Sequence, residues 1–393
     1  EWNYFIVELR ILCIDFGLCN FHNLVSLAEA GHKVYVATTF EEPPRAYLKS
    51  LGIKSLATEI VKRDSKLLQW IDKSEIDLII NTSPRNSHLY PNLERRADYI
   101  GLTPDASKLE TNKFFVRESV EKLGIKTPRL LDTPTFPCVM KPKDTLAQYH
   151  DYAQICLTRE SYENVEKGDT TFAHYLEEYI PDNVETNVAY AISGGKWSIM
   201  HTQEVIGEDV AKQAGNFLHW TNTSSFAKLS TEDERLAIEN AETYLNWAVQ
   251  FGGDYVGQIT GLVKDGEWYF CENNVRPEQT NSLPYFITGD EWLEGMRGNP
   301  DIIGDAFPND VQKMIVMPNE ANSIYPFYLH EKYGVAIPCG LDIIDGEYMV
   351  ADMVRSRADD GRIGIIICDR EIPLDFIEDL KNNSNFSVSH CFI

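Results

Sequence analysis

The chain has 393 residues, of which 43% are hydrophobic and 24% are charged, and its 36 Lys and Arg against 60 Asp and Glu give a formal net charge of −24. These fractions are ordinary for a globular protein, which excludes a chain that is mainly disordered, collagenous or coiled coil. An acidic surface repels phosphate backbones and no run of five basic residues interrupts it, so nucleic acids and anionic membranes are excluded as main partners.

The length predicts two or three domains. No apolar stretch approaches the roughly 20 residues that span a bilayer, and Glu1, Glu8 and Arg10 stand where a secretory signal would have a basic and then an apolar region. We therefore expect a cytoplasmic protein. Position 1 is not Met, so we expect the first residues to be the edge of a fragment or a remnant of cloning.

The eight cysteines lie far apart in the sequence, at positions 13, 19, 138, 156, 271, 339, 368 and 391. They form no pair spaced as zinc ligands are, and their density is far below that of a disulfide scaffold. We expect most of them to be buried, small apolar residues in a reducing compartment.

The first hundred residues show the rhythm of an open α/β fold. Short apolar strands are predicted at 11–15, 34–38 and 77–81, with helical stretches between them. The turn after the first strand contains one glycine, Gly17, where a dinucleotide-binding loop needs three, which argues against NAD or FAD at this place.

The middle of the chain alternates helices with strands and hairpins. Helices are predicted at 107–124 and 231–251, the second with a capping box of Thr231 and Glu234. The predicted strands of this region and of the tail lie at 138–142, 173–180, 188–192, 197–200, 268–274, 313–317, 342–349 and 362–368. We infer three domains, at 1–105, 106–305 and 306–393, the last of them strand-rich.

Two polar side chains at the end of one strand are candidate metal ligands. Glu272 and Asn274 are two positions apart, so their side chains leave the same face of the strand. Carboxylate and amide oxygens suit Mg²⁺, which is usually completed by water and nucleotide phosphates. Arg276 adds a cation close by. By spacing alone, two solvated residues at a strand end would look the same.

Two lysines and one acidic segment are further candidates. Lys141 ends a strand, from where its ammonium can reach an anion over the sheet edge, and Lys113 stands at the start of a helix, where the dipole disfavours a cation. Residues 177–180 resemble a segment that offers backbone groups and an apolar side chain to a nucleotide base, and Glu185 follows. Taken singly, each is also typical of a solvated surface or an edge strand.

The order of these segments resembles the phosphoribosylamine–glycine ligases of the ATP-grasp superfamily. Residues 106–113 and 124–128 resemble the family's "A-x-L-E-x-S-K … G-I-P-T", and 139–142 its "V-V-K-A" strand. Residues 176–180 with Glu185 are similar to "E-E-F-L-x-G-x-E", and 271–279 to a shortened "E-x-N-x-R-x-G-D-P-E-T-Q". The likeness runs from about 105 to 285 and is collinear throughout.

The resemblance implies an ATP-grasp fold, with an N-terminal open α/β domain before it and a small strand-rich domain after it. It also implies ATP as cofactor, and Mg²⁺ or alternatively Mn²⁺ as the metal. The implied roles are Lys113 and Lys141 for the nucleotide phosphates, Glu177, Glu178 and Ile180 for the adenine, Glu185 for the ribose, Glu272 and Asn274 for the metal, and Arg276 with Lys141 for catalysis at the acyl phosphate.

The implied activity is an ATP-dependent carboxylate–amine ligase that makes an amide through an acyl phosphate. By resemblance, it joins glycine to phosphoribosylamine in purine synthesis, with small molecules as its partners and a monomer or homodimer as its assembly. Phosphoryl transfer depends mainly on positioning and charge neutralisation, which lysines and a metal can supply in an acidic protein.

The chain departs from the family in two segments. The family's glycine-rich phosphate loop is replaced by glycine-free residues 143–150, where Lys143 or His150 are candidate substitutes, and "N-T-G-G-M-G" is replaced by 207–220. Two alternatives therefore stay open, a ligase with a different amino acid or amine, and a non-catalytic nucleotide-binding module. A module has no need of a metal pair, so Glu272 and Asn274 favour an enzyme.

Overall fold

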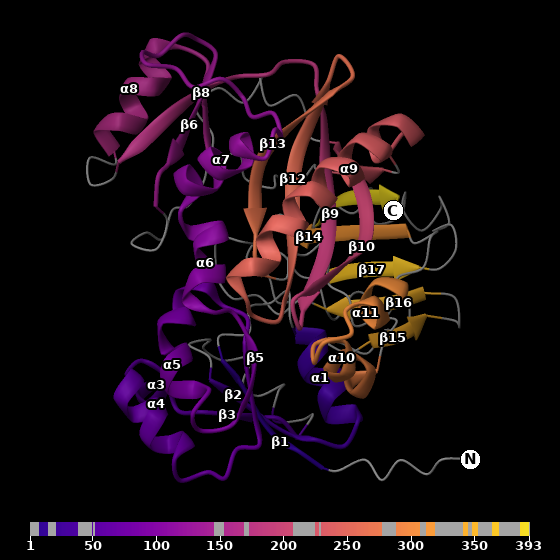
Figure 1. Ribbon diagram of the computed structural model, residues 1–393. Coiled ribbons are helices and arrows are strands. Elements are labelled where there is room, and N and C mark those ends of the chain that lie inside the picture. Colours follow the sequence, from indigo (N-terminus) through magenta and orange to yellow (C-terminus); the bar gives the residue numbers. More distant parts are fainter. Residues whose placement is uncertain are drawn as a thin grey trace.

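The computed structural model describes side chains and backbone over most of residues 8–14, 21–37, 49, 52–144, 153–168, 173–206, 225–227, 229–276 and 288–306. It also describes the backbone of five later strands, at 312–318, 341–344, 348–352, 364–368 and 386–392. Figure 1 shows an N-terminal α/β unit at the bottom, a small sheet at the upper left and a large sheet through the centre and right.

The N-terminal unit is a five-stranded parallel sheet in the order β3-β2-β1-β4-β5. The central strands are buried almost completely, as expected for a parallel sheet that is covered on both faces. The strands are β1 (Arg10–Ile14), β2 (Lys33–Ala37), β3 (Lys54–Ser55), β4 (Leu78–Asn81) and β5 (Asp98–Gly101), and the helices are α1 (Phe21–Glu29), α3 (Thr58–Val61), α4 (Asp64–Ile71) and α5 (Tyr90–Leu93). The predicted open α/β fold is confirmed.

The helix predicted at 107–124 is instead two helices, α6 (Pro104–Thr111) and α7 (Lys113–Lys122). Asn112 separates them with φ −109° and ψ 76°, and its side chain accepts a hydrogen bond from the amide of Phe115. It thereby caps α7. The prediction of one helix was wrong because the apolar spacing continues across the break while the cap interrupts the backbone. Lys113 consequently becomes the first residue of a helix.

A small antiparallel sheet of three strands, in the order β7-β6-β8, stands beside α7. Its strands are β6 (Cys138–Pro142), β7 (Gln154–Cys156) and β8 (His174–Glu178), and α8 (Arg159–Gly168) lies next to them. The strand predicted at 138–142 is confirmed with the same bounds. Lys141 lies near the end of the central strand, within reach of β8 in its own sheet and of the large sheet.

The large sheet has ten strands in the order β13-β12-β9-β10-β11-β18-β14-β17-β16-β15. The first part contains β9 (Val184–Ser193), β10 (Lys196–Ile206), β11 (Ser225–Ala227), β12 (Tyr255–Lys264) and β13 (Glu267–Asn274). The second part contains β14 (Gln312–Pro318), β15 (Leu341–Ile344), β16 (Tyr348–Asp352), β17 (Gly364–Cys368) and β18 (Phe386–Phe392). The strands predicted at 188–192, 197–200 and 268–274 are confirmed within β9, β10 and β13, whereas the strand predicted at 342–349 is divided between β15 and β16.

The tail strands continue the hydrogen bonding of the large sheet, because β18 pairs with β11 and with β14. The region is strand-rich, as predicted. The domain boundaries near 105 and 305 stay predictions.

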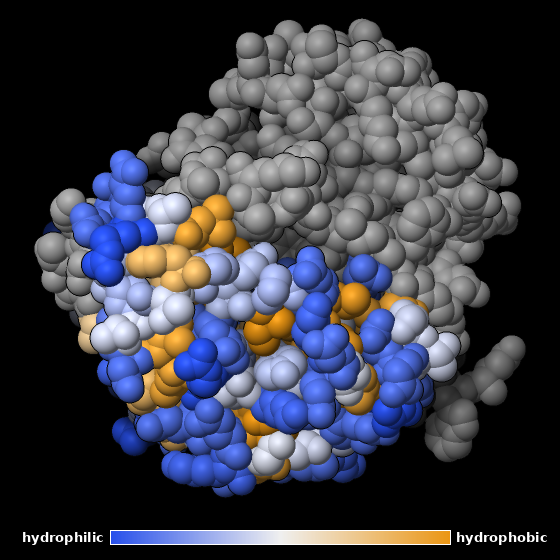
Figure 2. All heavy atoms as spheres, turned by 90° about the horizontal axis from the view of Figure 1, so that it is seen from above, coloured by the Kyte–Doolittle hydropathy of each residue, from blue (hydrophilic) through white to orange (hydrophobic). Residues whose placement is uncertain are grey.

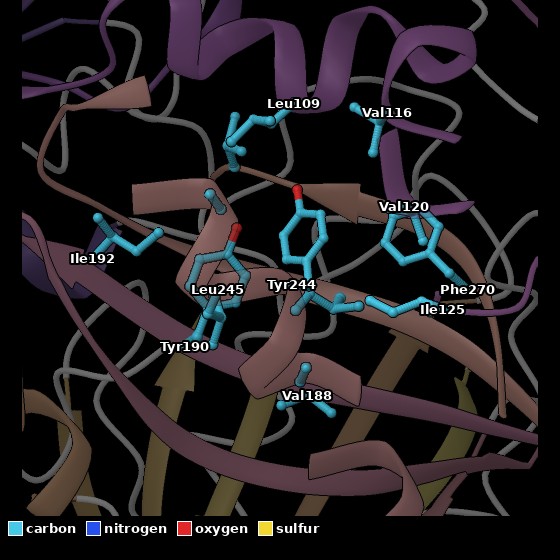
Figure 3. Packing of buried hydrophobic residues seen from close by; sticks show 14 of the residues in the cluster. Leu109, Val116, Val120, Ile125, Val188, Tyr190, Ile192, Tyr244, Leu245 and Phe270 are labelled. Atoms are coloured by element: carbon cyan, nitrogen blue, oxygen red, sulfur yellow. The ribbon is translucent and has the colours of Figure 1, made fainter. Parts of the chain in front are cut away.

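The main core lies between one face of the large sheet and helix α9 (Thr231–Ala248), with α6 and α7 alongside (Figure 3). Tyr244 of α9 stacks on Phe270 of β13 with ring centroids 5.5 Å apart. Leu245 and Tyr190 are fully buried in the same cluster. Because α9 covers one face of the sheet, polar residues of β9, β12 and β13 must gather on the other face.

Two short helices, α10 (Gly289–Gly295) and α11 (Asp301–Asp305), connect the large sheet to the N-terminal unit. A Cβ on Gly289 would lie 2.6 Å from the carbonyl oxygen of Ser26, so only glycine lets α10 approach α1 this closely. The buried ring of His32 accepts from the amide of Leu9 and lies 3.1 Å from Asp290 of α10. These contacts fix the two units to each other.

The described surface is mixed in character. Figure 2 shows hydrophilic and hydrophobic residues interspersed over its coloured part, and Leu130 is the only large hydrophobic residue that is exposed among the described residues. Of the four described cysteines, Cys13, Cys138 and Cys156 are buried and Cys271 is partly buried, as predicted for most of them. Within the described chain, no helix is both long and apolar enough to cross a membrane.

The cap of α9 differs from its prediction. The N-cap is Ser230, whose hydroxyl accepts from the amide of Asp233, and Glu234 instead accepts a hydrogen bond from Thr202 of β10. The predicted capping box of Thr231 and Glu234 is therefore wrong. The sequence offers two adjacent hydroxyl residues, and packing against β10 selects the earlier one.

Ser230→Ala should lower the free energy of unfolding by about 1 kcal/mol, because it removes the hydrogen bond that caps α9. Thr231→Ala is the matched control and should have a smaller effect, because Thr231 is already inside the helix. Urea unfolding followed by circular dichroism measures both. A larger loss in the Thr231 variant would contradict the assignment of the cap.

Candidate functional site

A β-bulge at Cys271 sets the direction of the candidate metal ligands. Gly261 of β12 pairs with Phe270, but the next residue, Thr260, pairs with Glu272, so Cys271 is an extra residue in β13. Without the bulge, Glu272 would share the core face with Trp268 and Phe270. The bulge turns Glu272 and Asn274 to the opposite face of the sheet, away from α9.

Lys113 and Glu272 form an ion pair at this face. The Nζ atom of Lys113 lies 2.6 Å from Oε2 of Glu272, and the two side chains are 11% and 31% exposed. The charge of Lys113 and its hydrogen bond outweigh the effect of burial and lower the pKa of Glu272 to about 2. The carboxylate also explains why a lysine is tolerated in the first turn of α7, where the dipole is unfavourable.

Lys141 crosses from the small sheet to the large one. Its Nζ atom lies 2.7 Å from Oε2 of Glu177 and donates a hydrogen bond of 2.9 Å to the carbonyl oxygen of Cys271, the residue of the bulge. Burial opposes the charge of Lys141, but the Glu177 carboxylate outweighs it, and the pKa of the ammonium is raised. The contact with Cys271 is a hydrogen bond, whereas Oε2 of Glu177 has no hydrogen-bond partner among the described residues and attracts the ammonium by its charge.

Arg117 completes a buried network around Glu177. Its Nε donates to Oε1 of Glu177 at 2.8 Å, while its other nitrogens donate to Glu121 and to the carbonyl oxygen of Pro128. The side chains of Arg117 and Glu177 are 4% and 2% exposed. Glu177 therefore holds Lys141 in place through its carboxylate.

The other residues predicted around the nucleotide lie near this network. Glu178 sits at the rim of the small sheet and pairs with exposed Arg129 at 3.2 Å, and Ile180 is buried. Glu185 lies on β9. Burial, with Glu272 as a second cause, raises its pKa to about 7. Their roles toward adenine and ribose stay predictions.

Arg276 is anchored by a residue that the sequence did not single out. Its Nε donates to Oε1 of Glu110 at 2.8 Å, and Oε2 of the same carboxylate accepts from the amide of Val275 at 2.9 Å. Because both oxygens of Glu110 accept hydrogen bonds, this residue connects the end of β13 to α6. More than half of the Arg276 side chain is shielded, and its charge also contributes to the lowered pKa of Glu272.

The donor set fits a magnesium ion. Glu272 supplies a carboxylate and Asn274 an amide oxygen on one face, and no cluster of three or more His, Cys, Asp or Glu suited to a metal occurs among the described residues. Magnesium is commonly held by one or two carboxylates and completed by water and phosphates. Such a shared site suits these two residues better than an all-protein cage.

The structure therefore brings together Lys113 with Glu272 and Lys141 with Glu177, and places Arg276 near them. It does not bring Glu178 into that charge network. Lys143, a candidate substitute for a phosphate loop, lies over the ring of Phe114 at 4.6 Å from its centroid. His150, the segment 207–220 and the residues after Arg276 in the matched motif lie outside the described residues.

Arg117 and Glu110 are residues of the candidate site to which the sequence interpretation gave no role. For Arg117 a signal was present, because Lys113, Arg117 and Glu121 are spaced by four and share one side of α7. Glu110 occupies the Glu position of the motif at 106–113, but its contact with Arg276 had no signal in the sequence, since the two residues are 166 positions apart.

Solved structures with known activities share this architecture. Biotin carboxylase from Campylobacter jejuni is 14% identical with a TM-score of 0.67, and the alignment covers 98% of this chain and 92% of that one. N5-carboxyaminoimidazole ribonucleotide synthetase from Thermus thermophilus is 15% identical with a TM-score of 0.66, covering 94% and 96%. L-amino acid ligase from Bacillus licheniformis is 13% identical with a TM-score of 0.65, covering 98% of both.

The chain therefore has the ATP-grasp fold, as the sequence resemblance predicted. At these identities the likeness establishes the fold and leaves the narrower resemblance to phosphoribosylamine–glycine ligases untested. No protein-family model and no curated protein sequence matches the chain.

Arg117→Met should lower the free energy of unfolding by about 3–5 kcal/mol, because it leaves a buried carboxylate with one of its two cations missing. Arg129→Met is the matched control, since Arg129 pairs with the neighbouring Glu178 but is exposed, and should cost less than about 1 kcal/mol. Equal losses in denaturant titrations of the two variants would contradict the assignment of a buried network.

Glu185 should make the protein less stable as pH rises. Because its pKa is raised from 4.5 to about 7 in the folded state, the unfolded chain loses this proton first. The free energy of unfolding then falls by on the order of 2 kcal/mol between about pH 4.5 and 7, and it is constant above pH 7. Glu185→Gln should remove this fall.

Urea titrations of wild type and Glu185→Gln at pH 5 and pH 8 measure this effect. Because the histidines titrate in both proteins, their contribution cancels in the difference between the two free energies of unfolding. A pH dependence that is the same in both proteins would disprove the raised pKa.

Proposed function

We propose that the protein is an ATP-dependent ligase that activates a carboxylate as an acyl phosphate and transfers the acyl group to an amine. The observation that carries the proposal is the meeting of Lys141 and Glu272 at the bulge of β13, with Lys113 between α7 and the sheet. Two cations and a carboxylate with an adjacent amide oxygen are the parts that phosphoryl transfer requires. The ATP-grasp fold supports it, because solved structures of that fold are ATP-utilising enzymes and include an L-amino acid ligase.

Lys113 and Glu272 neutralise each other when no nucleotide is bound. A bound nucleotide would offer its phosphates to the ammonium of Lys113, and the carboxylate of Glu272 would then be available to hold Mg²⁺ together with Asn274. The exchange leaves no buried charge unpaired in either state, which avoids a large desolvation penalty. When bound, the metal neutralises phosphate charge; Mn²⁺ remains an alternative ion.

Lys141 is a pre-positioned donor for a phosphate oxygen. The charge of Glu177 and the hydrogen bond to the Cys271 carbonyl hold the ammonium in place, and an ammonium with three N–H donors can also donate to a ligand. A donor that is held in place before the reaction needs little reorganisation as charge moves to the leaving phosphate. Arg276, fixed by Glu110, supplies a second cation beside the acyl phosphate.

We infer glycine and phosphoribosylamine as the substrates to test first, because the motifs between 105 and 285 resemble those of the ligases that join them in purine synthesis. The carboxylate attacks the γ-phosphate of ATP and releases ADP, and the amine then displaces phosphate to form the amide. A different amino acid or amine is the second candidate, favoured by the structural likeness to L-amino acid ligase.

ADP release should require Mg-ATP, glycine and freshly generated phosphoribosylamine together, with each omitted in turn as a control. Other L-amino acids and bicarbonate replace glycine in parallel reactions. Release with another carboxylate or amine would assign the second candidate. If ATP binds but no combination releases ADP, the ligase proposal fails and a nucleotide-binding module replaces it.

Glu272→Ala should reduce this ADP release at least about a hundredfold, because the metal loses its only carboxylate among the described ligands. Glu267→Ala is the matched control on the same strand, since Glu267 forms an exposed pair with Lys126, and it should retain activity. Full turnover in the Glu272 variant would remove the metal assignment.

A further inference from the structure

A row of four polar side chains crosses the large sheet at one level. Glu272 of β13 pairs with Thr260 of β12, Thr260 pairs with Asn187 of β9, and Asn187 pairs with Gln203 of β10. Residues that are directly paired in antiparallel strands point to the same face. The row therefore begins at the candidate metal ligand and continues over the face that α9 does not cover.

Two amides of this row lack hydrogen-bond partners among the described residues. Gln203 is completely buried, and neither its Nε2 nor its Oε1 is paired. Asn187 is also completely buried; its Oδ1 accepts from Thr260 at 2.8 Å, but its Nδ2 is unpaired. A buried amide without hydrogen bonds lowers the stability of the folded state, and most buried polar groups in proteins are hydrogen-bonded. The unpaired groups of the two amides are consequently suited to hydrogen bonds with a bound ligand.

The hydrogen bond from Thr260 fixes which end of the Asn187 amide faces a ligand. Because the hydroxyl occupies Oδ1 from the β12 side, the two N–H groups of Nδ2 are turned away from Thr260. Gln203 is the paired residue on the next strand, about 5 Å away along the hydrogen-bonding direction. Together the two amides offer several donors and one acceptor to a single ligand.

The charges around the row select against an anion at this place. Glu185 lies two positions from Asn187 on the same face of β9, and Glu272 stands at the start of the row. In the described part of the chain, the one cation bonded to the row is Lys113, which is paired with Glu272. A neutral group that both donates and accepts hydrogen bonds, such as a hydroxyl or a carboxamide, complements these amides.

The length of the row indicates which substrate carries that group. Asn187 and Gln203 are two and three strand spacings from Glu272, or about 10 and 14 Å. An ammonia or methylamine molecule at the acyl phosphate is too short to reach them. An amine with polar substituents extends far enough.

We propose that Asn187 and Gln203 are specificity-determining residues that bind neutral hydroxyl or carboxamide groups of the amine substrate. The inference rests on the proposed ligase function and adds the class of amine to it. The free protein buries these unpaired amides at a cost in stability, because the substrate supplies their missing hydrogen bonds when it binds. Such an exchange of stability for function is common at binding sites.

Gln203→Met tests the proposal, since Met keeps the length of the side chain and removes its hydrogen bonds. We expect the KM for phosphoribosylamine, or for the amine that gives turnover, to rise at least tenfold while the KM for ATP stays unchanged. The rate with ammonia as acceptor should not change. The exposed Gln250→Met is the matched control and should leave every parameter unchanged.

The thermal unfolding midpoint of the free Gln203→Met protein should be equal to or above that of the wild type, because the variant no longer buries an unpaired amide. A lowered midpoint would show that Gln203 is bonded within the fold, and an unchanged KM for the polar amine would show that it does not contact substrate. Either result overturns the proposal.

A binding experiment separates this proposal from the proposed function. Calorimetric titration of glycinamide and of ethanolamine into the MgADP-loaded protein distinguishes carboxamide from hydroxyl recognition, with methylamine as the probe that lacks both groups. We expect at least one of the first two to bind the wild type and not Gln203→Met, even if no amine supports turnover. Absence of binding by both to the wild type would overturn the proposal.

Discussion

The buried charge network of Lys141, Glu177 and Arg117 is the constraint on which the candidate site depends. It joins the central strand of the small sheet to α7 and, through the carbonyl oxygen of Cys271, to the edge of the large sheet. A pair of ions removed from water is stable only with good geometry and additional hydrogen bonds. The network meets that requirement with two cations around the Glu177 carboxylate, with Glu121 as a second carboxylate on Arg117, and with two backbone carbonyls, those of Pro128 and Cys271.

The bulge at Cys271 connects this network to the chemistry of the site. One extra residue frees a carbonyl group from the regular ladder, which Lys141 then uses, and the same residue turns Glu272 away from the core. Packing and function thus share a single strand, with Trp268 and Phe270 facing α9 and Glu272 and Asn274 facing the opposite side. Removal of the bulge would place a carboxylate in an apolar core.

The electrostatics of the polar face differ from those of the protein as a whole. The chain carries a net charge of −24, yet Lys113, Lys141, Arg117 and Arg276 gather around two strands. Each cation is held by a carboxylate, so the face is nearly balanced before any ligand binds. In the proposed function, a nucleotide that brings its own negative charge and its own metal would exchange partners with these pairs. Beyond Glu272, the row continues with the hydroxyl of Thr260 and the amides of Asn187 and Gln203, which suit an uncharged part of a substrate.

The amino-acid sequence by itself determined the order of elements, the open α/β start and the fact that Glu272 and Asn274 share one face of a strand, because these follow from local periodicity and from strand geometry. The bulge at Cys271 decided which face that is. The sequence also placed Lys113 and Lys141 as candidates. The tertiary structure alone decided that Asn112 divides a helix, that Ser230 caps α9, and that Arg117 and Glu110 hold the catalytic candidates. The same is true of the row from Glu272 to Gln203. The physical reason is that a cap choice, a bulge and an ion pair between residues 60 to 166 positions apart depend on which elements lie side by side, and local sequence does not encode that pairing.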